Sequence, residues 1–253
     1  MSLLDGVRRV VVVHAHPDDE TLATGVLLAQ LVRDGVDVHV VTCTRGERGE
    51  LVPGVTDVEP GSPDYVAHRE RELAKALRAL GVRHHAFLGM PPARVPGAGS
   101  PRVYRDSGMR WVREGLAGPA QDSGPAALTA AALDDVAADL AAYVDRVEPD
   151  VLISYDEGGG YGHPDHVRTA EATRSVAGRR GIRMLEVVPP DREVAGDPAA
   201  TEWIDLSARL PEAREALRAH ASQVTVEGDE VVHVGGQREP IATRIGLRRT
   251  ASS

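Results

Sequence analysis

The chain has 253 residues, of which 42% are hydrophobic, so it can bury a core of its own. Its 38 acidic residues outnumber its 29 basic ones and give a net charge of −9, which argues against a protein that grips a nucleic-acid backbone. No run approaches the roughly 20 apolar residues of a membrane span, and the N-terminal stretch does not resemble a signal peptide. We therefore expect a cytoplasmic protein with no nucleic-acid and no membrane partner.

Segments with strand and helix patterns alternate along the chain. Short runs rich in β-branched residues predict strands, and stretches with apolar residues three and four apart predict helices. In chain order we expect a strand at 8–16, a helix at 20–35, strands at 36–44 and 83–89 around a helix at 64–82, a helix at 128–149, a strand at 150–156, a helix at 164–178, a strand at 183–188 and a helix at 210–223. This order predicts an α/β fold, a doubly wound, mostly parallel Rossmann-like sheet with helices on both faces.

Residues 89–127 interrupt this alternation, because they are rich in Gly and Pro. A loop of this length inside a compact domain is typically a lid or a binding loop. A disordered insertion is the alternative, but the stretch "VYRDSGMRWV" is rich in aromatic, charged and apolar residues. With no repeat and no linker elsewhere, we predict a single domain over 1–253, in which 89–127 is a loop insertion on the substrate side.

The stretch "HAHPDDE", residues 14–20, directly follows the apolar run of the first predicted strand. In open parallel sheets, ligands bind beyond the carboxyl ends of the strands. His16 and Asp19 are three residues apart across a turn at Pro17, so an imidazole nitrogen and a carboxylate oxygen can converge on one cation. Asp18 and Asp19 are neighbours and point differently in a turn, so one of them can bind metal while the other faces a reactant. The simpler alternative is that these acidic residues only favour the dipole of the following helix.

A second cluster, "YDEGGGYGHPDH" at 155–166, follows the fourth predicted strand and should face the same crevice. Pro164 suits the first turn of a helix, which places His163 and His166 about one turn apart. Histidine and aspartate ligands without cysteine suit zinc, or another borderline divalent ion such as ferrous iron. Three protein ligands leave a position for water, a nearby carboxylate can take its proton, and a second imidazole can stabilise an oxyanion or protonate a leaving amine. This chemistry is hydrolysis of an amide or ester.

The motifs "AHPDDE" and "GGYGHPDH", in this order, resemble those of the LmbE-like (PIG-L) family of metal-dependent N-deacetylases. The likeness continues through "VTCTRGERGE", "ELAKALRALGV", "YRDSGM" and "ALRAHASQVTVEGDE" and so covers most of the chain. The resemblance implies a hydrolase with one zinc ion per chain and an amino-sugar substrate. By this resemblance His16, Asp19 and His166 would bind the metal, Asp18 would be the general base, His163 the general acid and oxyanion stabiliser, Asp165 the residue that orients His163, Tyr161 a contact to the carbonyl oxygen, and Arg69 and Asp106 the substrate-binding residues.

Within the family, the chain looks closest to the deacetylases of mycothiol biosynthesis, which implies N-acetylglucosaminyl-inositol as the substrate. Two features depart from that pattern: the segment after residue 188 is shorter, and the ending "PIATRIGLRRTASS" does not match. The stretch "TRGERGE" also looks partly like the mycothiol S-conjugate amidase. An amidase, a deacetylase of another amino sugar such as an antibiotic-type glycoside, and a metal-dependent sugar-binding module without turnover remain alternatives.

Several singled-out residues also have structural interpretations. We expect His14 to be structural, Tyr161 could cap the glycine loop, and Arg69 could be a solvated helix charge. Cys43 is expected to be a small buried residue. The remaining histidines have no spacing partners in the sequence, and we interpret each as a surface or a satisfied core residue: His39, His68, His84, His85, His220 and His233.

Overall fold

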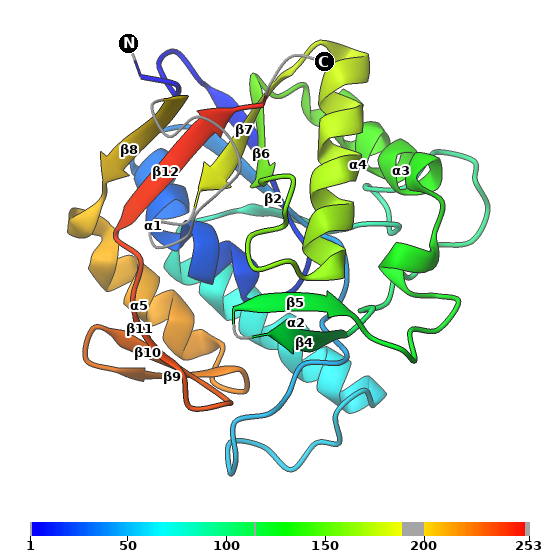
Figure 1. Ribbon diagram of the computed structural model, residues 1–253. Coiled ribbons are helices and arrows are strands. Elements are labelled where there is room, and N and C mark those ends of the chain that lie inside the picture. The colour runs from blue at the N-terminus through cyan, green and yellow to red at the C-terminus, as the bar shows by residue number, and fades with distance from the viewer. Residues whose placement is uncertain (1, 114, 189–199, 251–253) are drawn as a thin grey trace.

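The computed structural model describes residues 2–113, 115–188 and 200–250 and is built around a seven-stranded sheet (Figure 1). The strand order is β3-β2-β1-β6-β7-β12-β8. The five strands from β3 to β7 in this order are parallel, whereas β12 is antiparallel to both β7 and β8. The strands span Arg9–His14 (β1), Asp37–Thr42 (β2), His84–Phe87 (β3), Val151–Tyr155 (β6), Arg183–Val188 (β7), Thr201–Asp205 (β8) and Arg244–Arg249 (β12).

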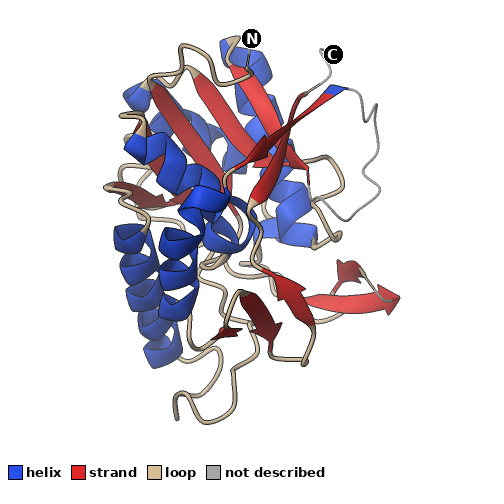
Figure 2. Ribbon diagram, turned by 90° about the vertical axis from the view of Figure 1, so that its left-hand side faces the viewer, coloured by secondary structure: helices blue, strands red, loops and turns tan. Residues whose placement is uncertain are grey.

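Helices cover both faces of this sheet, as the sequence predicts (Figures 1 and 2). Successive residues of a strand point to opposite faces, so β1 sends Val10 and Val12 into one core and Val11 and Val13 into the other. The first core is closed by α1 (Asp19–Arg33), α2 (Pro63–Ala79) and α5 (Leu210–Ala219), and the second by α3 (Leu133–Val147) and α4 (Pro164–Arg180). Because both faces of β1 are buried, its run of valines needs no polar alternation.

Two predicted elements differ from the structure. The helix expected at 128–149 is divided into a 3₁₀ turn at Leu128–Ala130 (η1) and α3, because Ala131 and Ala132 are extended. After a 3₁₀ turn at Ser207–Arg209 (η3), the helix expected at 210–223 ends at Ala219, and a strand begins at Val224. Beyond residue 200 the prediction also missed β8, β12 and a separate small sheet of β9 (Val224–Glu227), β10 (Glu230–His233) and β11 (Arg238–Pro240).

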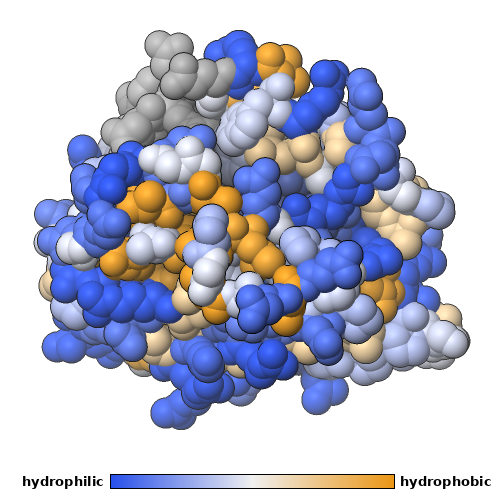
Figure 3. All heavy atoms as spheres, turned by 90° about the horizontal axis from the view of Figure 1, so that it is seen from below, coloured by the Kyte–Doolittle hydropathy of each residue, from blue (hydrophilic) through white to orange (hydrophobic). Residues whose placement is uncertain are grey.

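Residues 89–127, expected as a loop insertion, contain a short hairpin. It is formed by β4 (Met109–Arg113) and β5 (Leu116–Pro119), and the rest of the segment is largely irregular. The hairpin and the β9–β11 sheet lie below the large sheet in Figures 1 and 2. Seen from that side, hydrophobic side chains gather toward the middle of the face and hydrophilic ones surround them (Figure 3). Among the described residues, no helix combines the length and the apolar character needed to span a bilayer.

Candidate active site

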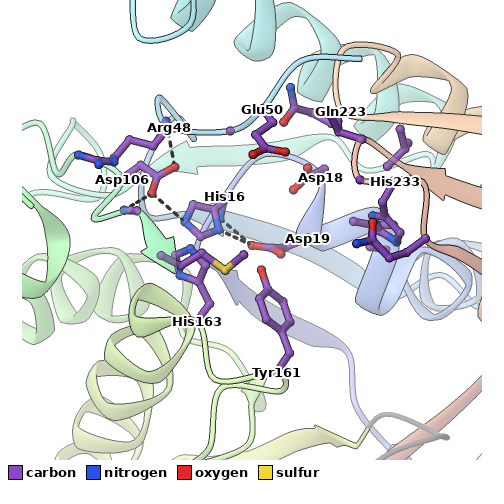
Figure 4. A pocket seen from close by; sticks show the side chains of 18 of the residues that line it. His16, Asp18, Asp19, Arg48, Glu50, Asp106, Tyr161, His163, Gln223 and His233 are labelled. Carbon is purple, nitrogen blue, oxygen red and sulfur yellow. Dashed lines mark hydrogen bonds and ion pairs between the residues drawn. The ribbon is translucent and has the colours of Figure 1, made fainter. Parts of the chain in front are cut away.

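Asp19, the first residue of α1, lies between two imidazole rings, that of His16, which follows β1, and that of His166, which belongs to α4. Figure 4 shows the first of them, His16, beside Asp19. Its Oδ2 is 3.2 Å from Nδ1 of His16, and its Oδ1 is 3.3 Å from Nε2 of His166. The backbone N–H of His16 also donates to Oδ2 over 2.8 Å. All three side chains are buried, so the two sequence clusters do meet, as their positions after β1 and β6 predict. Burial raises the pKa of Asp19, but the neighbouring His166 and the hydrogen bond with His16 outweigh it and hold that pKa well below its ordinary value.

The other nitrogen of His16 faces Asp165. Nε2 of His16 is 3.2 Å from Oδ2 of Asp165, which is fully buried in the first turn of α4. Ser107 holds this carboxylate in place, because its backbone N–H donates over 2.8 Å and its hydroxyl over 2.5 Å. The carboxylate of Asp165 therefore orients His16. The hydrogen bond between Asp165 and His163 is made by the backbone N–H of Asp165.

His163 is the N-cap residue of α4, and its imidazole itself makes the capping bond. Nδ1 accepts from the backbone N–H of Asp165 over 3.1 Å, which fixes the ring and leaves the proton on Nε2. Burial and the neighbouring His16 and His166 lower the pKa of His163 to about 2, although Asp165 opposes them. In this structure His163 is therefore a neutral hydrogen-bond donor.

Asp18 has an unusual backbone conformation, with a φ of 117°, which few residues other than glycine adopt. Glu20 supports it by accepting from the backbone N–H of Asp18 over 2.9 Å, and His220 in turn donates to Glu20 over 2.8 Å. The side chain of Asp18 makes no helix-capping bond, whereas Asp19 and Glu20 are the acidic residues of the first turn of α1. Burial raises the pKa of Asp18 to about 6, although the guanidinium of Arg69 opposes this.

Arg69 is buried rather than solvated, so the simpler interpretation of this residue was wrong. Only 2% of it is exposed, and Nη2 is 3.1 Å from Oδ2 of Asp18. The same nitrogen donates to the carbonyl of Pro17, and Nη1 donates to the carbonyl of Gly46 over 2.6 Å. A side chain at Gly46 would collide with this guanidinium, which explains a glycine there. Arg69 thus holds the turn that presents Asp18.

The cluster lies at one side of a cavity of about 840 Å³. The predicted substrate-binding residues Arg69 and Asp106 line it, and so does Tyr161, which Figure 4 shows reaching in from the side opposite Asp18. Asp106 is held by the backbone N–H groups of Gly108, over 2.8 Å, and of Arg48, over 3.2 Å. The segment that contains β4 contributes Met109 and Trp111 to the wall, and the C-terminal segment contributes Gln223, His233 and Gln237.

Sequence reasoning missed Tyr155, the last residue of β6. Its hydroxyl donates to Oδ2 of Asp19 over 2.7 Å and accepts from the backbone N–H of Ala15 over 2.9 Å. Its ring stacks on that of His166, with centroids 4.2 Å apart, and meets the edge of His14, which is fully buried as expected of a structural residue. Its position directly before the "DEGGGYGHPDH" stretch was the available signal, but tyrosine is also a common strand residue.

The residues of the cluster fit a divalent cation. Nε2 of His166 is buried and has no hydrogen-bond partner among the described residues, although a carboxylate oxygen lies 3.3 Å away. Two ligands of a tetrahedral ion with bonds of about 2.0–2.1 Å lie roughly 3.4 Å apart. Donor nitrogens of His16, His163 and His166 also lie within 4.8 Å of one another. The cluster is therefore a candidate metal site, with ligands to choose from this set and Asp19.

Comparisons with known proteins agree with this picture. The family described as PIG-L: GlcNAc-PI de-N-acetylase matches residues 11–177. A 1D-myo-inositol 2-acetamido-2-deoxy-alpha-D-glucopyranoside deacetylase of Kineococcus radiotolerans is 40% identical, with 92% of this chain and 73% of the relative covered. A deacetylase of the same name from Actinosynnema mirum is 37% identical, with 87% and 82% covered. The crystal structure of the zinc-inhibited form of a teicoplanin deacetylase has the same fold, with a TM-score of 0.61, 19% identity and coverage of 97% and 100%.

The match spans both sequence clusters that meet at Asp19, and the curated relatives align with most of the chain. The chain therefore belongs to the PIG-L family of GlcNAc-PI de-N-acetylases, and it is a hydrolytic N-deacetylase.

Proposed function

We propose that this enzyme removes the acetyl group from N-acetylglucosaminyl-inositol. The support comes from the curated relatives, which carry the name of that activity and align with most of the chain. A cavity of about 840 Å³ beside the His/Asp cluster has the size of a small-molecule site, which agrees with a sugar substrate. We also propose that the enzyme acts in the cytoplasm, as a biosynthetic enzyme for such a substrate would. In this proposal the chain is one domain over 1–253, and residues 89–127 lie on the substrate side.

One observation carries the proposed mechanism. A carboxylate with no capping role, that of Asp18, stands beside the Asp19 cluster at the wall of the same cavity. We assign His16, Asp19 and His166 as the residues that would hold one zinc ion, with ferrous iron as the alternative, because imidazole and carboxylate accept both. A divalent ion there would polarise the amide carbonyl and lower the pKa of a water molecule.

The protein's own residues then have separate tasks. Asp18 takes the proton of the attacking water, and Arg69 keeps its carboxylate in place through the 3.1 Å contact. The Nε2–H of His163 and the hydroxyl of Tyr161 donate to the oxygen on which negative charge develops. Because a neutral imidazole gives up its proton poorly, Asp18 is the better source of the proton for the departing amine, and the general-acid role of His163 stays a prediction. Arg69 and Asp106 would contact sugar or inositol hydroxyls from the cavity wall.

Replacing Asp18 by asparagine tests this assignment. Asparagine tolerates a positive φ and keeps the shape of the side chain but cannot accept the proton. We expect acetate release from N-acetylglucosaminyl-inositol to fall by about 10²–10⁴-fold, with the metal content unchanged. Asp34→Asn is the matched control, since Asp34 is an exposed carboxyl at the other end of α1. Activity of Asp18→Asn equal to that of the control would contradict the mechanism.

The same assay separates the substrate alternatives. The wild-type enzyme is incubated with N-acetylglucosaminyl-inositol and, separately, with a cysteinyl-glucosamine amide conjugate. Acetate from the first and no cleavage of the second supports the proposal. Cleavage of the conjugate alone would identify an amidase, and no reaction with either would point to another acetylated amino sugar or to a sugar-binding protein without turnover.

A further inference from the structure

A second group of metal-ligand residues lies at the other end of the large sheet. Asp37 is the first residue of β2, His39 follows two residues later, and His84 is the first residue of β3. His39 and His84 are direct partners in the parallel register of these strands. All three lie near the amino ends of their strands, whereas the catalytic cluster lies beyond the carboxyl ends of β1 and β6. The two sites therefore share no residue.

The donor atoms of this group converge. Nε2 of His39 is 3.3 Å from Oδ2 of Asp37, and Nε2 of His84 is 3.4 Å from Oδ1 of the same carboxylate. One donor atom of each residue lies within 4.8 Å of the other two. The two rings are stacked, with centroids 4.4 Å apart and planes 13° from parallel, so both present Nε2 toward the carboxylate.

His39 has a nitrogen without a hydrogen-bond partner. Only 9% of the residue is exposed, and its Nε2 makes no hydrogen bond with any described residue, although Asp37 is close. Its Nδ1 is 3.1 Å from the hydroxyl of Tyr143, which can accept the Nδ1 proton and leave a lone pair on Nε2. Burial lowers the pKa of His39, although Asp37 opposes this, so the ring is held in the neutral form that a metal needs.

The catalytic cluster provides an internal comparison. There, too, a buried imidazole Nε2, that of His166, lacks a hydrogen-bond partner and lies 3.3 Å from a carboxylate oxygen. The two distances from imidazole nitrogens to oxygens of Asp37, 3.3 and 3.4 Å, are also close to the roughly 3.4 Å expected between two ligand atoms of a tetrahedral ion. At both sites, therefore, a buried imidazole Nε2 that makes no hydrogen bond with a described residue lies 3.3 Å from a carboxylate oxygen.

The surroundings set the expected strength of binding. Nε of Arg9 is 3.0 Å from Oδ2 of Asp37, so a guanidinium shares the carboxylate and opposes a second positive charge. The side chain of His84 is 52% exposed and must lose freedom to bind. An ion here should therefore be held less tightly than one at the catalytic cluster, and it would join β2 to the edge strand β3.

We propose that Asp37, His39 and His84 form a second binding site for a divalent transition-metal ion of the zinc class, separate from the catalytic centre. The two imidazole ligands select such an ion over magnesium or calcium, which prefer oxygen ligands. Water completes its coordination on the exposed side.

Counting bound zinc tests the proposal. The enzyme is dialysed to equilibrium against micromolar zinc, and metal per chain is measured by elemental analysis. We expect His84→Ala to bind about one equivalent fewer than the wild type, with its deacetylase activity unchanged. His68→Ala is the matched control, because His68 also pairs with a carboxylate, Glu72, over 3.1 Å but belongs to no group of three ligands among the described residues. It should bind as much zinc as the wild type.

Each outcome bears on the proposal. Equal zinc content in the wild type and His84→Ala would overturn it, and so would an equal loss in His68→Ala, which would show non-selective binding to surface histidines. Melting temperatures in chelator show whether a variant is folded; if His84→Ala is not, Asp37→Asn takes its place with the same expectation. His166→Ala should keep the equivalent that His84→Ala loses, so failure of the proposed catalytic metal site is distinguishable from failure of this one.

Discussion

At the scale of single residues, the site depends on how each imidazole is held. His16 has Asp19 on one nitrogen and Asp165 on the other, and Ser107 fixes Asp165 with two hydrogen bonds. A carboxylate behind a metal-binding imidazole sets its tautomer and raises its basicity. Under the proposed assignment of His16 as a metal ligand, Asp165 would therefore support metal binding although it is not among the proposed ligands.

Asp165→Asn should weaken metal binding by about 10–100-fold while the protein stays folded. The reason is that an amide carries no negative charge and therefore makes the His16 imidazole a weaker ligand than a carboxylate does. Competition with a chromophoric chelator measures the affinity, and saturating metal should restore most of the activity. An unchanged affinity would show that His16 does not bind the metal through the nitrogen that faces Asp19.

His163 can be assigned by comparing two substitutions. His163→Gln keeps a polar N–H near the oxyanion but has no titratable group, whereas His163→Ala removes both. If hydrogen-bond donation is the main role, the activity of His163→Ala should fall by about 10²–10³-fold. The glutamine variant should then be at least about tenfold more active than the alanine variant. Equal kcat values for the two variants, at equal metal content, would instead favour the general-acid role.

At the scale of elements, the hairpin β4–β5 contributes to the cavity with a largely exposed aromatic residue. Trp111 is 53% exposed, lines the cavity and lies with its ring 5.8 Å from that of Tyr161. Its neighbour Val112 is 57% exposed but does not line the cavity. Substitutions at these two residues can therefore distinguish an effect of lining the cavity from an effect of being exposed on β4.

Trp111→Ala should raise KM by about three- to tenfold and leave kcat within twofold, because a contact worth roughly 1 kcal/mol is lost on binding. Val112→Ala should change neither constant. Steady-state kinetics with N-acetylglucosaminyl-inositol measure both, and thermal melts check that the variants are folded. A fall in kcat without a change in KM would mean that the hairpin acts on the chemistry rather than on binding.

The sequence was most informative where local pattern decides structure. β1 and α1 were predicted within a few residues, because an apolar run and a helical repeat are local signals, and the position of a cluster after a strand then predicted where His16 and His166 meet. β12 could not be predicted, since its antiparallel place between β7 and β8 depends on partners distant in the chain. The same limit applies to His39 and His84, whose pairing is set by the register of β2 with β3 and not by spacing.

At the scale of the whole molecule, buried neutral histidines should make the fold sensitive to acid. Burial lowers the pKa of His14 and of His85 to about 4, although Asp19 and Glu20 partly oppose it at His14, and Glu20 at His85. The unfolded chain binds these protons near pH 6.5, so stability is fully present above that pH and is lost as the pH falls from about 6.5 toward 4.

His85→Gln should reduce this loss by up to about 3 kcal/mol, because the shift at one histidine is removed. The residue lies on β3 and is not one of the proposed catalytic or metal-binding residues, and glutamine can keep the hydrogen bond that joins His85 to Thr42 over 3.0 Å. Urea unfolding at pH 7.5 and at pH 4.5 gives the free energies of unfolding. If the free energy of unfolding falls equally between pH 7.5 and pH 4.5 in the wild type and the variant, His85 is not a cause of the acid sensitivity.

The antiparallel insertion of β12 also bears on how the chain is synthesised. Within the described residues, strand β8 pairs only with β12, which leaves the ribosome later. During synthesis β8 therefore has no neighbouring strand at first, while the strands from β3 to β7 can already assemble. The residues 223–237 that wall the cavity emerge in the same interval. A nascent chain can thus have the proposed metal ligands in position before the wall of the cavity is complete.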